Sequence, residues 1–205
     1  MNNIARSLVI FLSFVLITSG CSTDKPRQLR IGVSQCSNGP WREKQNREME
    51  RELLLHDNVT MDLICAEDDN ERQIADIQQF IDEKYDLIIV SPNEPAPLTE
   101  IISKAYRSGT PVVLFDRRIE GTDYTAFVGG DNASAGRLLA EFAASQKSNG
   151  QVKVIELMGH MQTTPAILRH QGFITELTNH PEIQLLASVD AAWDGDRAMS
   201  ITDSL

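Results

Sequence analysis

Asp86-Leu-Ile-Ile-Val-Ser-Pro-Asn-Glu94 is the stretch that decides the fold, because a short apolar run passes directly into polar residues. The run shows no alternation of apolar and polar side chains, which is typical of a central parallel strand buried on both faces. Leu29–Ser34 ends in the same way before Gln35, and Pro111–Phe115 ends before Asp116. Since open parallel sheets bind ligands outside the carboxyl ends of their strands, these polar residues mark a candidate site for a small molecule.

Helical segments with apolar faces separate these runs along the chain. The first helix is expected to have an inward-facing stripe formed by Trp41, Gln45, Met49 and Leu53. Asn70, with Gln73 three residues later, predicts a second helix that begins with a capping box. Further strands are expected at residues 59–65, 125–128, 152–158 and 183–189. The alternation predicts an α/β fold with parallel sheets flanked by helices.

The first twenty residues have the features of a signal peptide. They contain one charge, an apolar run from Leu8 to Ile17 that is too short to span a bilayer as a mature helix, and small residues before Cys21. This context of Cys21 resembles a bacterial lipobox, in which the cysteine becomes the lipidated first residue. Simple secretion and an uncleaved signal anchor are the alternatives. We therefore expect a lipoprotein-type signal peptide at 1–20, a tether at 21–28, and a periplasmic product held at the membrane.

Charge and motif content argue against several classes of function. With a formal net charge of −10 and no run of Lys or Arg, the chain lacks the positive surface of a nucleic-acid-binding protein. No G-x-G-x-x-G, P-loop or HExxH motif occurs, and the four histidines do not have the spacing of metal ligands. The first strand also lacks the second glycine of a nucleophile elbow. We therefore expect no enzyme activity, no cofactor, no metal ion and no nucleic-acid partner.

Two cysteines beyond the leader, Cys36 and Cys65, each follow or end a predicted strand. If these strands are neighbours in the sheet, an oxidising periplasm permits a disulfide between the two thiols. A disulfide also needs Cα atoms within about 7 Å and converging side chains, which a sequence does not show. Two free, buried thiols are the alternative.

Four motifs, taken in order, resemble the type 1 periplasmic sugar-binding proteins, whose fold is shared by the effector domains of lac-repressor-like regulators. They are IGVSQCSNGPW at 31–41, DLIIVSPNE at 86–94, PVVLFDR at 111–117 and GGDN at 129–132. The sequence is most similar to the periplasmic sensor domain of Bacteroidetes hybrid two-component systems, over residues 29–205. The resemblance implies a two-lobed fold, with an N-terminal lobe at 29–128 and an incomplete C-terminal lobe at 129–205.

The same resemblance implies ligand-binding roles for Trp41, Arg42, Glu94, Asp116, Arg117, Arg169 and Trp193. Sugar chemistry agrees with these residue types, because hydroxyls donate to carboxylates and accept from guanidinium groups, while a C–H face packs on an aromatic ring. Structural roles are the alternatives. They are packing for the two tryptophans, a solvated turn for Glu94, a solvated helix face for Arg169, and helix capping for Asp131, Asn132 and Asp194.

We therefore expect a domain that binds a small carbohydrate by lobe closure and acts as the input domain of a signal-transduction protein. The alternative is a sugar-binding lipoprotein receptor of a transport system. A lac-repressor-type transcriptional regulator is the third possibility, but it needs a helix-turn-helix segment before Leu29 that the sequence does not provide. A histidine-kinase module or a permease would be the partner beyond these 205 residues. Because the second lobe is incomplete, we expect this chain alone to bind sugar weakly or not at all.

Overall fold

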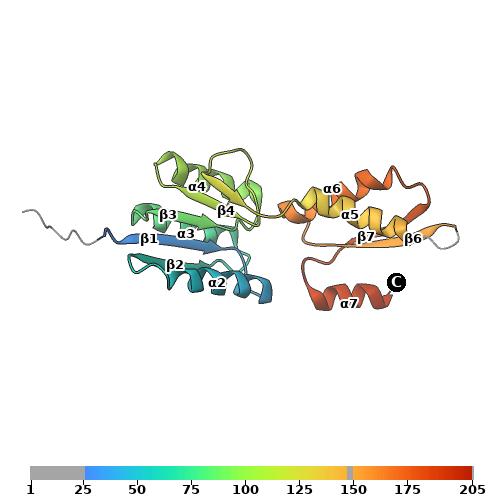
Figure 1. The fold of residues 1–205 in the computed structure, drawn as a ribbon, viewed down its shortest axis with the longest axis horizontal. Helices are drawn as coiled ribbons and strands as arrows, with labels where there is room; N and C mark the ends of the chain where they lie inside the picture. The colour runs from blue at the N-terminus through green and yellow to red at the C-terminus, as the bar shows by residue number, and fades with distance from the viewer. Residues whose placement is uncertain (1–25, 147–149, 205) are drawn as a thin grey trace, which may run out of the picture.

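Two separate parallel sheets make up the computed structural model, which describes residues 26–146 and 150–204 (Figure 1). The strands are β1 (Leu29–Gln35), β2 (Val59–Cys65), β3 (Leu87–Val90), β4 (Val112–Phe115), β5 (Ala126–Val128), β6 (Val152–Met158) and β7 (Ile183–Asp190). The helices are α2 (Pro40–Leu53), α3 (Asn70–Asp82), α4 (Pro95–Arg107), α5 (Asn132–Ser145), α6 (Thr164–Leu177) and α7 (Gly195–Ser204). The first sheet has the order β2-β1-β3-β4-β5, and the second pairs β6 with β7. We call β1–β5 with α2–α4 the first lobe, and β6 and β7 with α5–α7 the second lobe.

The core of the first lobe lies between its sheet and helices α3 and α4. Phe80 of α3 and Leu98 of α4 are fully buried, together with Ile88 of β3 and Leu114 of β4. Phe80 packs so closely on β1 that a Cβ at Gly32 would lie 2.6 Å from its ring, so this position of β1 accepts only glycine without a rearrangement. Each such buried side chain contributes about 1.5–3 kcal/mol of hydrophobic stabilisation.

The opposite face of the first sheet has less cover. Gln35 of β1 donates from Nε2 to Asn46 Oδ1 of α2 at 2.9 Å, which places α2 on this face. Leu87 and Ile89 of β3 share the face through the β1–β3 register and are half-buried, whereas Ile88 is fully buried on the core side. The predicted central position of β3 is confirmed, but its burial is complete on one face only.

In the second lobe, α5 and α6 cross in close contact. A Cβ at Gly136 of α5 would lie 2.0 Å from the carbonyl oxygen of Arg169, and a Cβ at Gly172 of α6 would lie 2.1 Å from that of Ala133. Two glycines therefore allow the helix backbones to approach. Helix α7 has no buried residue and lies on the other side of β6 and β7 from α5 and α6 (Figure 1). The sheet of the second lobe has two strands within the described residues.

Two local predictions about the helices are wrong. The inward stripe of α2 begins at Arg42, which is 5% exposed, and not at Trp41, which is 65% exposed. Arg42 is drawn inward by a carboxylate of the sheet described below. Helix α3 is capped by Asp69, whose carboxylate accepts from Arg72 N at 3.0 Å, and not by Asn70.

The two cysteines are unpaired: Cys36 is buried and Cys65 is half-buried. Of the two alternatives that the sequence left open, the structure therefore has the free thiols. Burial raises the pKa of the Cys65 thiol, which keeps it in the protonated, less reactive form.

The predicted signal peptide and Cys21 lie outside the described residues. Among the helices at 26–146 and 150–204, none has the length and apolar character that a bilayer crossing requires.

Candidate functional site

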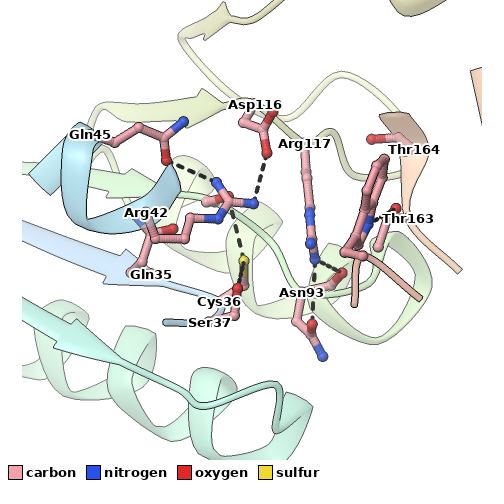
Figure 2. Close-up of polar contacts among 12 residues, drawn as sticks. Gln35, Cys36, Ser37, Arg42, Gln45, Asn93, Asp116, Arg117, Thr163 and Thr164 are labelled. Carbon is pink, nitrogen blue, oxygen red and sulfur yellow. Dashed lines mark hydrogen bonds and ion pairs between the residues drawn. The ribbon is translucent and has the colours of Figure 1, made fainter. Parts of the chain in front are cut away.

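Asp116 turns out of β4 toward helix α2. Its φ is 64°, a left-handed conformation that is costly for a residue other than glycine, and its backbone N–H donates to Val128 O at 2.8 Å. The carboxylate accepts from Nη2 of Arg42 at 2.7 Å, and Nη1 of Arg42 donates to Gln45 Oε1 at 3.1 Å (Figure 2). A strand end and the first turn of a helix thus share a half-buried ion pair.

Arg117 is buried beside this pair. Its Nη1 donates to the backbone carbonyl of Asn93 at 2.7 Å and to Asn93 Oδ1 at 3.4 Å (Figure 2). Burial lowers the pKa of Arg117, and the positive charge of nearby Arg42 lowers it further. No carboxylate in the described ranges forms an ion pair with Arg117. A guanidinium has five N–H donors, and the hydrogen bonds of Arg117 to Asn93 use Nη1 alone.

The second lobe brings two predicted ligand-binding residues, Trp193 and Arg169, into contact. The guanidinium carbon of Arg169 lies 5.5 Å from the centroid of the Trp193 ring. Nε of Arg169 donates to Asn132 Oδ1 at 2.8 Å, and the indole Nε1 of Trp193 donates to Thr163 Oγ1 at 3.3 Å. Like Asp116, Trp193 follows a strand with a positive φ, here 61°.

A hydrogen bond joins the carboxyl ends of the two sheets. The backbone N–H of Arg118 donates to Thr164 Oγ1 at 3.0 Å. Arg118 follows β4 and Thr164 follows β6, so the loops after these strands meet, and Figure 2 shows Arg117 next to Thr163 and Thr164. The first-lobe group and the second-lobe group therefore face the same region.

Trp41 and Glu94 are the two predicted residues that the structure does not bring into polar contact with the others. Trp41 is mostly exposed, which argues against a core-packing role. Glu94 is the N-cap residue of α4 and is half-buried, but its carboxylate makes no capping hydrogen bond. Both lie at the first turn of a helix that follows a strand of the first sheet.

Three buried polar residues near these groups were not predicted as ligands: Asn93, Thr163 and Asn132. Each lies within five residues of a strand's carboxyl end, and this position was the signal that could have identified them. The capping alternative is confirmed for Asp131, which accepts from Ser134 N, and for Asp194, which accepts from Arg197 N. It is wrong for Asn132, whose side chain accepts from Arg169.

The chemistry that this arrangement offers is hydrogen bonding and ring stacking. Guanidinium groups, the Asp116 carboxylate, side-chain amides and the Trp193 indole lie near the meeting strand ends. Within 26–146 and 150–204, no three His, Cys, Asp or Glu side chains gather in a way that could hold a metal ion.

A pocket of about 350 Å³ lies inside the second lobe and not between the two strand-end groups. It is lined by β6 residues and by Leu139 and Ala143 of α5, and Arg169 and Trp193 also contribute to its lining. Since β6 pairs with β7 along one edge only, the pocket marks the other edge of this two-stranded sheet.

Comparisons with known proteins agree with this fold. The family model of the periplasmic binding protein domain matches residues 31–205. The galactofuranose-binding protein YtfQ of Escherichia coli is 24% identical over 180 residues, which are 86% of this chain and 56% of that protein. The ribose import binding protein RbsB of Escherichia coli is 22% identical over 162 residues, 79% of this chain and 53% of that protein.

Among solved structures, the fructose-binding periplasmic domain of a hybrid two-component system has a TM-score of 0.80 and 43% identity, over 86% of this chain and 58% of that domain. The myo-inositol-binding protein of Caulobacter has a TM-score of 0.80 at 22% identity, over 90% and 62%, which shows the fold alone. The chain therefore spans between one half and two thirds of the length of these relatives. Because the family match covers most of its residues, the chain belongs to the periplasmic binding protein domain family, of which it contains the first lobe and part of the second.

Proposed function

We propose that this chain binds a small carbohydrate or polyol in the periplasm and serves as the input domain of a signal-transduction protein. The observation that carries the proposal is the group Arg42, Asp116 and Arg117 at the end of β4: buried Arg42 holds the Asp116 carboxylate, and the adjacent Arg117 is a second buried guanidinium that has no carboxylate partner among the described residues. Proteins similar to this chain are named for binding fructose, galactofuranose, ribose and myo-inositol. All four ligands are uncharged and rich in hydroxyl groups.

In this proposal, the charged residues bind the hydroxyl groups of the ligand and the tryptophans pack on its C–H surface. Asp116 accepts from ligand hydroxyls while Arg42 holds its carboxylate in place, and Arg117 donates its unused N–H groups to hydroxyl oxygens. Each charge-assisted hydrogen bond contributes about 1.5–3 kcal/mol. Trp41 and Trp193 are both partly exposed and supply ring faces for the C–H surface of the sugar.

The proposed mechanism is closure of the two lobes on the ligand. Asp116 and Arg117 belong to the first lobe, and Arg169 and Trp193 belong to the second, so a ligand that contacts both groups stabilises the closed arrangement. The ligand shifts the free energy of the open–closed equilibrium by the difference between its binding free energies for the closed and open states. The Arg118–Thr164 hydrogen bond lies where the lobes meet and would form part of the closed state.

The sensor role rests on the comparison of identities. The domain of a hybrid two-component system is 43% identical to this chain, whereas the galactofuranose-binding protein and the ribose import binding protein named above are 24% and 22% identical. The second candidate is a transport receptor, which those curated relatives favour. Sequencing of the DNA downstream of codon 205 separates them: a membrane span followed by a histidine kinase supports the sensor, and a neighbouring permease gene supports transport.

Membrane attachment through a lipid on Cys21 is part of the proposal. Metabolic labelling with a fatty-acid probe is expected to modify the chain and to leave a Cys21→Ala variant unlabelled. Equal labelling of both would exclude lipidation at this cysteine.

The binding proposal is tested by NMR titration of the purified chain with fructose, ribose, galactose and myo-inositol, with glutamate and AMP as unrelated probes. Of the two outcomes that the sequence left open for an incomplete second lobe, weak binding and none, the proposal commits to weak binding. We expect saturable shifts with at least one sugar or polyol, at a dissociation constant in the range of about 1 mM. Asp116→Asn should weaken binding at least about tenfold, since a charge-assisted bond is lost. Asp123→Asn is the matched control, because Asp123 is also a partly buried partner of an arginine, Arg107. No response to any sugar, or equal weakening by both variants, would contradict the proposal.

A further inference from the structure

Gln73 of α3 is fully buried and links three segments of the first lobe. Its Nε2 donates to the backbone carbonyl of Ser91 at 2.9 Å and, more weakly, to that of Ser34 at 3.4 Å. Its Oε1 accepts from the backbone N–H of Asn93 at 2.8 Å. One side-chain amide therefore connects α3 to the last residues of β1 and to the loop that follows β3.

Asn93 stands between Gln73 and the binding arginine. Its backbone carbonyl and Oδ1 accept from Arg117, while its Nδ2 donates to the carbonyl of Asp68 and to Asn70 Oδ1, both at 3.0 Å. The exposed fractions of Gln73, Asn93 and Arg117 are 0%, 3% and 6%. Solvent therefore does not replace these hydrogen bonds when one is removed, and the three residues form a continuous buried chain.

Arg117 depends on this chain because it has no ion-pair partner among the described residues. A carboxylate would fix the guanidinium by charge, but here the neutral oxygens of Asn93 are its hydrogen-bond acceptors. The orientation of Asn93 then decides where the remaining N–H groups of Arg117 point.

We propose that Gln73 is a positioning residue for ligand recognition: it fixes the backbone of Asn93, and Asn93 fixes the Arg117 guanidinium that faces the ligand. This inference rests on the proposed function for its role in binding, but the placement of Arg117 is measurable without a ligand. Only an amide fits the position, because it donates to two carbonyls and accepts from an N–H at the same time. A glutamate keeps the acceptor and loses both donors, and a methionine of similar shape loses all three bonds.

Phe80 provides the matched control. It lies seven residues after Gln73 on the same helix, is equally buried, and packs on Gly32 and, with a ring-centroid distance of 4.7 Å, on Tyr85. Phe80→Leu therefore lowers stability from the same face of α3 without touching the Asn93 hydrogen bonds. A merely structural role of Gln73 predicts that Gln73→Met and Phe80→Leu behave alike once their stabilities are matched with urea.

The test has two measurements on the full chain. The first follows the Nε–Hε resonance of Arg117 in ¹⁵N-arginine-labelled protein without ligand, assigned by its loss in Arg117→Lys. We expect this resonance to shift and its hydrogen exchange to accelerate at least about fivefold in Gln73→Met, and to stay unchanged in Phe80→Leu. The second is the fructose titration, in which Gln73→Met should weaken binding about fivefold and Phe80→Leu less than twofold.

The outcomes separate the two proposals. If the Arg117 resonance responds but the parent chain binds none of the sugars, Gln73 positions Arg117 and the proposed function fails. If the parent binds fructose and Gln73→Met changes neither the resonance nor the affinity beyond the Phe80→Leu control, the positioning role is overturned. Should Gln73→Met not fold, Gln73→Glu gives the same comparison, because it also loses both donors to Ser34 and Ser91.

Discussion

The two lobes are built from the same strand-helix unit, but they hold the residues proposed to bind the ligand differently. In the first lobe, five strands and helices α3 and α4 enclose a cluster of fully buried side chains. In the second lobe, two strands leave Ile155 and Leu157 of β6 exposed at 38% and 43%. The site follows this division, since Arg42 and Arg117 are buried whereas Arg169 is exposed and Trp193 is 47% exposed.

The difference in burial indicates which of the proposed binding residues have a fixed orientation before the ligand binds. A guanidinium that is buried and hydrogen-bonded in a packed lobe is fixed before the ligand arrives, whereas one on the surface of a two-stranded lobe loses conformational freedom on binding. Local opening also starts where few apolar contacts are buried. The first lobe is therefore expected to supply a fixed half of the site, and the second lobe a half that orders with the ligand.

The largest expected effect is the loss of stability when a buried phenylalanine is replaced by alanine, compared between the two lobes. Phe80→Ala removes a fully buried ring from the first-lobe core and should cost about 3–5 kcal/mol in the free energy of unfolding. Phe173→Ala acts in the second lobe, where many neighbours are half-buried, and should cost less. Urea titrations that follow the indole resonances of Trp41 and Trp193 measure each lobe separately. Equal shifts of both resonances by both variants would show that the lobes unfold as one unit.

Gly136→Ala tests whether the second lobe can be destabilised without an effect on the first lobe. The new Cβ would lie 2.0 Å from the backbone oxygen of Arg169, so α5 and α6 must separate, at a cost of about 1–3 kcal/mol. The Trp193 transition should move to lower urea while the Trp41 transition stays in place. Gly130→Ala is the control, because a Cβ there meets no atom within 4 Å. A Gly136→Ala transition like that of the parent would refute the close helix crossing.

Removal of their charge should affect the stability of the fold unequally for the two buried arginines of the first lobe. Arg42→Met leaves the Asp116 carboxylate, 22% exposed, without its partner and should cost about 1–3 kcal/mol. Arg117→Met removes a cation whose pKa burial lowers, so its cost should be about 1–2 kcal/mol smaller. Thermal unfolding of both variants without ligand checks this. A greater loss for Arg117→Met would mean that its charge has a partner in the fold.

The smallest expected effect is a pH dependence of the stability of the second lobe. The backbone N–H of Ser134, and next its hydroxyl, hold the pKa of Asp131 below its usual value at the start of α5. A carboxylate with a lowered folded-state pKa stabilises the fold above its unfolded pKa of about 3.9, and this contribution is lost as the pH falls through the folded value. The Trp193 transition should therefore weaken below about pH 4, and Asp131→Asn, which still caps, should flatten this dependence. An unchanged acid limb in Asp131→Asn would exclude the cap as its source.

Much of the fold is predictable from the sequence because its signals are local. The predicted bounds of β2 and β6 coincide with the structure, since each is a short run of β-forming residues. The inward direction of Arg42 is not predictable in this way. A helical stripe suggests that tryptophan faces the core, but Arg42 is buried through Asp116, which lies 74 positions away in sequence. The cap of α3 is ambiguous by one residue because Asp69 and Asn70 are both good cap formers.

The position of the candidate site was predictable where a buried strand ends in charged residues, as at Asp116 and Arg117, and its role in binding stays a prediction. Gln73 and Asn93 gave no comparable signal. A glutamine within a helix usually faces solvent, and its burial here depends on carbonyls of two separate strand ends, at Ser34 and Ser91. Such a role becomes visible only when the strands are placed side by side.

The central claim is that one small carbohydrate contacts both lobes at the carboxyl ends of their strands. The chain has two tryptophans, one in each half of the proposed site, so a fructose titration followed by their two indole N–H resonances tests the claim directly, with Trp41→Phe for assignment. We predict that both resonances move along one binding curve with the same dissociation constant. A titration in which neither moves, or in which only one of them responds, would contradict the account.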